Sequence, residues 1–219
     1  MGLTVHGDIC SPFVKIAAMT IYEKNEDFEL VFARLSLLKT EEFLAKNPFG
    51  RMPVLEDGDL VVFESRAVAR YVEAKFEGQG TPLMPANLKE QALVNIWAEV
   101  ESQSFCPPVW AICSQFLSKK VPDVSVIEAS REKLEKVLDI YEIQLSKRKY
   151  LAGDFFSLAD LFHIPLLHIL QCLSEDIFRS VINSRTYVHK WHQDITNRPS
   201  WKRIISVPEA SDWSFLPKV

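Results

Sequence analysis

The sequence predicts two parts of different architecture, an α/β domain followed by an all-α domain. In the first 77 residues, short strand-like apolar runs alternate with segments whose apolar residues recur at helical spacing. Asp57-Gly58 joins two of these β-runs, which is a strong hairpin signal. Beyond about residue 88 the strand signal largely disappears. A chain of 219 residues, 47% of them hydrophobic, is long enough to bury a core in one domain or two.

The expected elements of the first part follow a specific order. "LTVHG" (3–7) predicts a strand, and 12–25 predicts a helix with Pro12 at its first position. We then expect a strand at 28–35, a short helix at 40–47, the hairpin at 52–64 and a helix at 65–76 that Ser65 caps. The order β-α-β-α-β-β-α is that of a thioredoxin-like domain with a mixed four-stranded sheet. This predicted domain covers residues 1–77.

A segment rich in glycine and proline, "EGQGTPLMPAN", follows the first domain and predicts a linker at 78–88. Residues 89–219 are then expected to form an all-helical bundle. Its helices are predicted at about 88–118, 123–147 and 157–172, with shorter pieces to about 206. Within "FSLADL", Ser157 and Asp160 have the spacing of a capping box, which indicates a helix start and not a functional site.

Composition excludes several classes of function. The net charge of −4 and the pI near 5.8 argue against nucleic acid or an anionic membrane as the main partner. No apolar run reaches the roughly 20 residues that cross a bilayer, and no signal-peptide pattern precedes the first strand, so a cytoplasmic protein is expected. The four cysteines show no CxxC and no ligand-like spacing with the five histidines, so no metal site is predicted.

The stretch "GDICSPFVK" (7–15) places a thiol and a hydroxyl directly before a helix start. The positive end of a helix stabilises an anion, so either Cys10 or Ser11 could carry chemistry there. Ser11 also suits a plain helix cap, and Cys10 suits a packing role. A cis bond at Met52-Pro53 would turn the Met52 backbone towards an extended peptide ligand. Together these features suggest a thiol-binding module.

Three longer segments carry a family resemblance. "NPFGRMPVLEDGDLVVFESRAVARYV", "KYLAGDFFSLADLFHIP" and "NRPSWKRI" resemble cytosolic glutathione S-transferases, most closely the phi class of plants. The resemblance covers nearly the whole chain in the right order. It implies conjugation of glutathione to hydrophobic electrophiles, with reduction of organic hydroperoxides as a second activity. Glutathione is then a co-substrate, no further cofactor is expected, and the protein is a homodimer.

The resemblance also implies roles for individual residues. Ser11 would donate a hydrogen bond to the glutathione sulfur and so favour the thiolate. Phe49 would be the aromatic residue that each subunit inserts into its partner. The residues expected to bind the rest of glutathione are Lys39, Arg51, Met52, Pro53, Glu64 and Ser65.

A hydrophobic second substrate would bind beside glutathione. Candidate walls of its site are Phe13, Leu35, Phe105, Val109, Ile112 and Phe116. The last four share one helix face, a pattern that fits buried core as well as a ligand site. A kink at Pro107-Pro108 would help this face to open towards a cleft.

One departure from the phi pattern bears on activity. Phi enzymes commonly have His-Lys before "NPFG", whereas this chain has Leu38-Lys39, in a loop about two residues shorter. A ligand to the glycyl carboxylate of glutathione would then be missing. Two alternatives to a transferase therefore stay open, a low-activity carrier of apolar ligands and a thiol transferase that uses Cys10.

Overall fold

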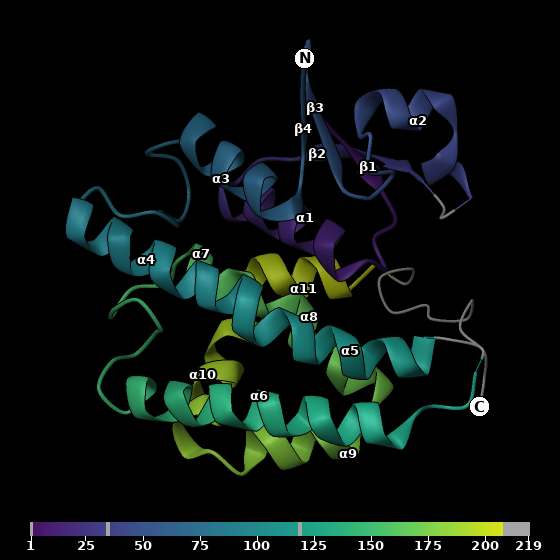
Figure 1. The fold of residues 1–219 in the computed structure, drawn as a ribbon. Coiled ribbons are helices and arrows are strands. Elements are labelled where there is room, and N and C mark those ends of the chain that lie inside the picture. Colours follow the sequence, from purple (N-terminus) through teal and green to yellow (C-terminus); the bar gives the residue numbers. More distant parts are fainter. Residues whose placement is uncertain (1, 34–35, 118–119, 208–219) are drawn as a thin grey trace. The chain divides into compact units, whose positions relative to one another are not determined.

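The computed structural model describes residues 2–33, 36–117 and 120–207, which fall into two units (Figure 1). The N-terminal unit comprises the residues up to Leu83 together with the segment that begins at Pro199. The helical unit runs from Met84 to Arg198. All strands of the described residues belong to the N-terminal unit, as the sequence predicts.

The N-terminal unit is built on a mixed four-stranded sheet, which confirms the predicted thioredoxin-like architecture. The strands are β1 (Leu3–Gly7), β2 (Phe28–Phe32), β3 (Val54–Asp57) and β4 (Leu60–Phe63), in the order β2-β1-β3-β4. Strand β1 is parallel to β2 and antiparallel to β3, and β3 is antiparallel to β4. The predicted hairpin is present, with Asp57 paired to Leu60 and Gly58 in the left-handed region that the turn requires.

Helices cover both faces of this sheet. They are α1 (Pro12–Glu23), α2 (Glu41–Lys46) and α3 (Ser65–Lys75), with a 3-10 turn η1 (Leu37–Lys39) before α2. Helices α1 and α3 pack against each other on one side of the sheet, and α2 lies on the other (Figure 1). On the α2 side, Glu56 of β3 pairs with Lys46 and also with His6 of β1, 2.7 Å away.

The last helix, α11 (Pro199–Ile205), belongs by its contacts to the N-terminal unit and packs on α1. Ser200 donates a hydrogen bond to Glu23, and Arg203 pairs with Asp27. The sequence pattern places this segment in the helical domain of 89–219, whereas in the structure it belongs to the N-terminal unit. Helical spacing predicts a helix but does not indicate which distant residues the helix contacts. The units divide after Leu83, and the predicted linker at 78–88 contains this position.

The helical unit contains the predicted helices, but they are interrupted at more positions than the sequence predicts. Its elements are α4 (Leu88–Val100), a π-helical segment η2 (Glu101–Phe105), α5 (Cys106–Leu117), α6 (Val124–Leu145), α7 (Leu158–Leu161), α8 (His163–Leu173), α9 (Glu175–Phe178), a second π segment η3 (Arg179–Asn183) and α10 (Thr186–Thr196). The irregular segment η2 ends two residues before Pro107-Pro108, where the missing proline N–H groups disturb the helical bonding.

Aromatic and hydrogen-bonded side chains form the centre of the helical unit. The hydroxyl of Tyr141 and Nε2 of His163 lie 2.9 Å apart, and the rings of Phe105 and Trp191 pack on His163. The predicted capping box at Ser157 and Asp160 is present. Burial raises the pKa of the Asp160 carboxyl to about 6.

Candidate functional site

Three loops that carry predicted site residues meet at one end of the sheet. Strand β1 ends at Gly7, and its neighbour His6 pairs with Val54, the first residue of β3. Val54 in turn pairs with Phe63, the last residue of β4. Because β1 and β4 both run antiparallel to β3, the end of β1, the start of β3 and the end of β4 coincide. The loops with Ser11, Met52-Pro53 and Glu64-Ser65 therefore leave the sheet at the same end of its strands.

The loop between β1 and α1 is a tight turn organised by Asp8. The Asp8 carboxylate accepts a hydrogen bond from the backbone N–H of Cys10, 2.9 Å away. The Asp8 carbonyl accepts another from the N–H of Ser11, also 2.9 Å away. These bonds set Ser11 in extended conformation directly before the first helical residue, Pro12. Asp8 was not among the predicted site residues, although an aspartate two residues before the bonded N–H is a turn signal.

The hydroxyl of Ser11 does not cap helix α1, although Ser11 occupies the cap position. Among the described residues, its Oγ has no hydrogen-bond partner. The N-cap alternative from the sequence is therefore not realised in this structure. A partly exposed hydroxyl at the positive end of a 12-residue helix is available for an anionic ligand.

Cys10 lies one residue earlier, and only 6% of its surface is exposed. A disulfide-exchange nucleophile must reach its substrate in solution, and this side chain is covered. The burial agrees with the packing role that the sequence favours for Cys10.

The peptide bond between Met52 and Pro53 is cis, which confirms the sequence expectation. The side chain of Met52 reaches the Ser11 loop, where its Sδ accepts a hydrogen bond from the Asp8 N–H at 3.3 Å. Gly7 permits close packing beneath this loop, because a Cβ at position 7 would lie 2.5 Å from Cγ2 of Val14. The Met52 loop and the Ser11 loop are thus in direct contact.

The junction between β4 and α3 is strained at Glu64, whose φ of 69° is unusual for a residue with a side chain. Such a conformation costs roughly 1–3 kcal/mol and is typical of functional sites. Glu64, and not Ser65, occupies the cap position of α3, and no side-chain bond caps the helix there. The predicted cap at Ser65 is therefore wrong by one position. Ser65 is buried in the first turn, beside the N–H groups at the helix start.

The two cations expected near the glycyl end of glutathione lie beside the turn at 47–50. Lys39 Nζ donates a hydrogen bond to the Phe49 carbonyl at 3.3 Å. The carbonyl of Arg51 accepts one from Asn47 Nδ2 at 2.7 Å, and the Arg51 side chain is exposed. Both side chains are at the surface, where they can contact a soluble ligand.

Leu38, which stands where phi enzymes commonly have histidine, is buried in an apolar cluster. The cluster also contains Ala33, Phe43 and Val54, with Met52 packed against it. The leucine therefore contributes to the core of the N-terminal unit and does not face a ligand.

We expect Leu38→His to destabilise the protein and not to tighten glutathione binding. A buried imidazole without a partner in this apolar cluster should lower the free energy of unfolding by on the order of 2 kcal/mol. Urea denaturation measures this change, and Leu38→Met, which keeps the volume and the apolar character, is the control. A histidine variant of parental stability with a lower Michaelis constant for glutathione would show that position 38 does reach the ligand.

Three of the six residues predicted to line the second substrate site are core in this structure. Phe105, Val109 and Ile112 are fully buried in the helical unit, where α5 packs against α6 and α8. The core alternative that the sequence leaves open therefore describes these three residues. Phe13 and Phe116 are half-buried, and Leu35 lies outside the described residues. Trp110, which the prediction did not include, is the exposed aromatic residue of α5.

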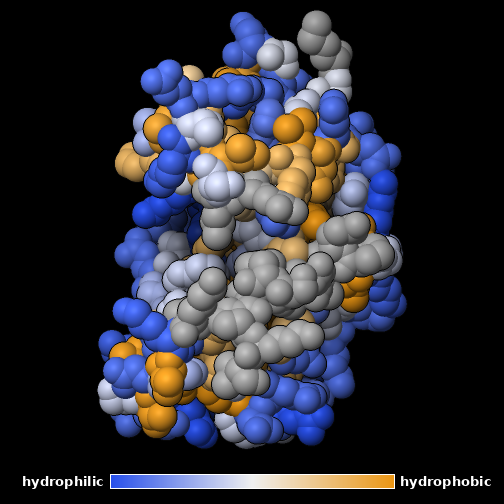
Figure 2. Space-filling model, turned by 90° about the vertical axis from the view of Figure 1, so that its right-hand side faces the viewer, coloured by the Kyte–Doolittle hydropathy of each residue, from blue (hydrophilic) through white to orange (hydrophobic). Residues whose placement is uncertain are grey.

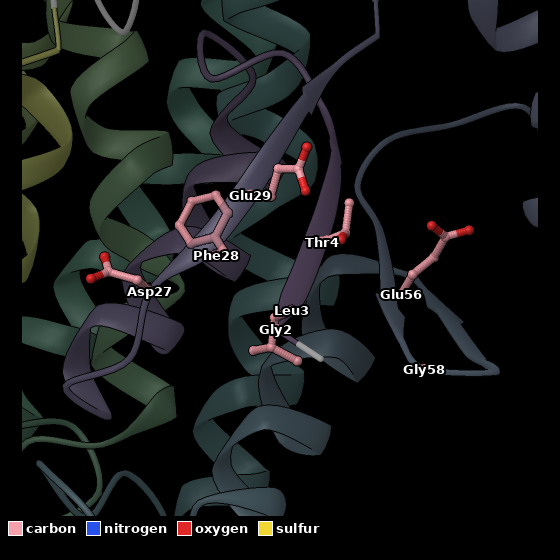
Figure 3. Close-up of a pocket in the computed structure, with 8 residues that line it drawn as sticks. All are labelled: Gly2, Leu3, Thr4, Asp27, Phe28, Glu29, Glu56 and Gly58. Carbon is pink, nitrogen blue, oxygen red and sulfur yellow. The ribbon is translucent and has the colours of Figure 1, made fainter.

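A cavity of about 550 Å³ lies at the other end of strand β1 (Figure 3). Its lining includes Asp27 and Glu29, at the start of β2, and Glu56 of β3, and their carboxylates do not converge on one point (Figure 3). This end of β1 is opposite to the end where the loops with Ser11, Met52-Pro53 and Glu64-Ser65 meet, and none of these residues lines the cavity. Two of its carboxylates also have cationic partners already, Glu56 in Lys46 and Asp27 in Arg203. The cavity is therefore not a candidate for the glutathione site.

Two kinds of structural feature are absent from the part of the chain that the structure describes. None of its helices combines the length and the apolar character needed to cross a membrane. It also contains no cluster of three His, Cys, Asp or Glu residues that could hold a metal ion.

Comparisons with known proteins agree with the fold. The family model "Glutathione S-transferase, N-terminal domain" matches residues 1–74, and "Glutathione S-transferase, C-terminal domain" matches residues 105–199. A glutathione S-transferase of Hyoscyamus muticus is 39% identical over 94% of this chain and 98% of its own length. The chain therefore belongs to the glutathione S-transferase family.

Solved structures of similar proteins indicate to which class of glutathione S-transferases the chain belongs. Glutathione transferase F7 from Populus trichocarpa is 44% identical, with a TM-score of 0.89 over 93% of this chain and 98% of that chain. Glutathione S-transferase I from mais, solved in complex with an atrazine glutathione conjugate, is 33% identical, with a TM-score of 0.86 over 97% of this chain and 100% of that chain. Several of the similar proteins carry the letter F in their names, which denotes the phi class of plants. The chain is therefore a phi-class member.

Proposed function

We propose that this chain conjugates glutathione to hydrophobic electrophiles with Ser11 as the residue that activates the thiol. The observation that carries the proposal is the Ser11 hydroxyl, which stands at the start of α1 without capping it. No resident cofactor is needed, since glutathione itself is the second substrate. A cytoplasmic homodimer is the form in which we expect the protein to act.

The proposed chemistry depends on the pKa of the glutathione thiol. A free thiol has a pKa near 8.5, so only a few per cent is thiolate at neutral pH. A hydrogen bond from Ser11 Oγ and the positive end of α1 both favour the anion. A fall of about two pKa units corresponds to roughly 2.7 kcal/mol of preferential stabilisation. The thiolate then attacks the electrophilic carbon, a C–S bond forms, and the leaving group departs with its electron pair.

The remaining loops would hold glutathione in place. In this proposal Glu64 and Ser65 bind the γ-glutamyl end, where the strained junction before α3 presents helix N–H groups to a carboxylate. The backbone of Met52, before Pro53, pairs with the cysteinyl part. Lys39 and Arg51 lie near the glycyl carboxylate. The atrazine glutathione conjugate bound by the similar protein from mais supports a conjugating role.

Three assays on the purified protein separate the proposed function from its alternatives. Conjugation of chlorodinitrobenzene tests the transferase, cumene hydroperoxide reduction tests the peroxidase activity, and hydroxyethyl disulfide reduction tests the thiol transferase. We expect conjugation to dominate. Binding of an apolar dye without turnover in any assay would favour the carrier, and dominant disulfide reduction would favour Cys10.

Phe49 supports the proposed homodimer. Its side chain is 62% exposed and has only one close aromatic neighbour among the described residues, the Phe63 ring at 6.2 Å. Apolar residues also gather on the upper part of the face shown in Figure 2. A large exposed aromatic side chain typically anchors an interface by filling a pocket of the partner. The alternative, that Phe49 is local core, does not agree with its exposure.

Replacing Phe49 with alanine is expected to weaken the homodimer by about 2–4 kcal/mol while each subunit stays folded. Sedimentation measures the dimer dissociation constant, and circular dichroism checks the fold. Phe32, half exposed on the edge strand β2, offers a matched Phe→Ala control. An unchanged dissociation constant for the Phe49 variant would remove it from the interface.

A further inference from the structure

We propose that the thioether of Met52 positions Ser11 for catalysis, by holding the turn that carries Ser11. The inference rests on the proposed function, since it assumes that Ser11 acts on the glutathione sulfur. It assigns to the Met52 side chain a role that is separate from the role of its backbone. Met52 is a positioning residue in this scheme, because it acts on the reaction only through the Asp8–Ser11 turn.

Hydrogen bonds connect Met52 to Ser11 through a single residue. The Sδ of Met52 accepts the backbone N–H of Asp8 at 3.3 Å. Asp8 in turn accepts hydrogen bonds from two backbone N–H groups further along the turn, that of Cys10 through its carboxylate and that of Ser11 through its carbonyl. The Asp8 backbone therefore donates a hydrogen bond to Met52 through its N–H and accepts one from Ser11 through its carbonyl. A shift of the Asp8 backbone would move Ser11 with it.

The Met52 side chain is itself fixed from the core side. It packs against the apolar cluster of Ala33, Leu38, Phe43 and Val54. The backbone of Gly7 lies close to it, since a Cβ at position 7 would be in ordinary van der Waals contact with the Met52 Cβ, at 3.5 Å. The thioether is thus presented to Asp8 by a packed support and not by a mobile surface chain.

The chemistry of sulfur makes this contact specific. A thioether accepts a weak hydrogen bond and donates none, whereas leucine has nearly the same volume and accepts none. Leucine at position 52 would keep the packing and leave the Asp8 N–H without its acceptor. A displacement of well under 1 Å at a catalytic group already lowers the rate, because reacting groups must be aligned closely. We therefore expect an effect on turnover that is distinct from any loss of stability.

The test compares four variants of the full-length protein. Met52→Leu removes the acceptor, and Met52→Gln restores one through its amide oxygen. Met19→Leu is the matched control, since Met19 is buried in α1 and has no hydrogen bond to its sulfur among the described residues. Ser11→Ala reports on the proposed function alone. The measurements are kcat/KM for conjugation, its dependence on pH, the ultraviolet absorbance of bound thiolate during pH titration, and the thermal midpoint.

We expect Met52→Leu to lower kcat/KM by about threefold to tenfold and to raise the apparent pKa of bound glutathione, with the KM for glutathione and the thermal midpoint nearly unchanged. Met52→Gln should recover most of the loss, and Met19→Leu should match the parent. Parental kinetics and pH profile in Met52→Leu would overturn the inference. Equal losses in the leucine and glutamine variants would overturn it as well, because packing would then explain both. Full activity in Ser11→Ala would instead refute the proposed function.

Discussion

Replacing Ser11 with alanine is expected to lower kcat/KM for conjugation by about 100-fold, the loss typical for a key electrostatic donor in an active site. The Ser11 hydroxyl lies at the start of α1 but does not cap the helix. Its removal therefore takes away a donor to the thiolate and breaks no hydrogen bond among the described residues. Glutathione should still bind, since the proposed contacts at Glu64, Ser65 and Met52 remain. Steady-state kinetics with chlorodinitrobenzene and a separate glutathione titration distinguish the two effects.

The neighbouring position provides the matched control. Cys10→Ser should leave kcat/KM within a few-fold of the parent, because Cys10 is buried. Ser11→Cys should lose conjugation and gain disulfide reduction, since a thiol at the positive end of a helix has a lowered pKa and becomes a nucleophile. If Cys10→Ser abolished activity while Ser11→Ala had a mild effect, the serine mechanism would be wrong and the thiol transferase alternative would replace it.

Local sequence signals were sufficient for most of the fold. The hairpin at Asp57-Gly58, the helix start at Pro12 and the capping box at Ser157 each depend on residues a few positions apart. Such short-range patterns determine local conformation strongly. The assignment of α11 to the N-terminal unit could not be predicted in this way, because its partners Glu23 and Asp27 are far away in sequence.

The sequence pattern could propose candidate site residues but not the orientation of their side chains. Periodicity places Phe105, Val109 and Ile112 on one helix face, yet it does not say whether that face meets core or ligand. The same limit applies to Leu38, whose burial depends on how η1 packs against the sheet. Asp8 and the thioether of Met52 were missed because their contact joins segments 44 residues apart. Contacts of this kind become visible only when the loops are assembled.

A buried ionic network in the N-terminal unit was equally invisible in the sequence. Lys24, at the end of α1, is fully buried and pairs with Glu73 of α3 at 2.5 Å. Its ammonium also donates to the Thr81 carbonyl at 2.9 Å, and Glu73 accepts the N–H of Leu83 at 3.1 Å. The pair thus joins α1, α3 and the segment that follows α3. Buried charges are expensive to transfer from water, so each partner depends on the other.

Lys24→Met is expected to lower the free energy of unfolding by about 3–5 kcal/mol, the usual cost of breaking a buried ion pair from one side. The variant would remove the cation that lies 2.5 Å from the Glu73 carboxylate and the donor that lies 2.9 Å from the Thr81 carbonyl. Urea denaturation gives the change. Arg179→Met is the control, because Arg179 and Glu175 form an ion pair at 2.6 Å that is largely exposed. Exposed pairs contribute on the order of 0.5 kcal/mol, so the control should stay near the parent.

A double variant separates the loss of the pair from the loss of packing at position 24. The double variant Lys24→Met with Glu73→Gln replaces the Glu73 carboxylate with a neutral amide, whose oxygen can still accept a hydrogen bond from the Leu83 N–H. Because the largest cost in the single variant is a buried carboxylate that has lost the Lys24 ammonium, the double variant should be more stable than Lys24→Met alone by roughly 2 kcal/mol. Equal stability of the two variants would mean that Glu73 finds water or another partner once Lys24 is gone. The network would then be held together by its backbone hydrogen bonds and not by the ion pair.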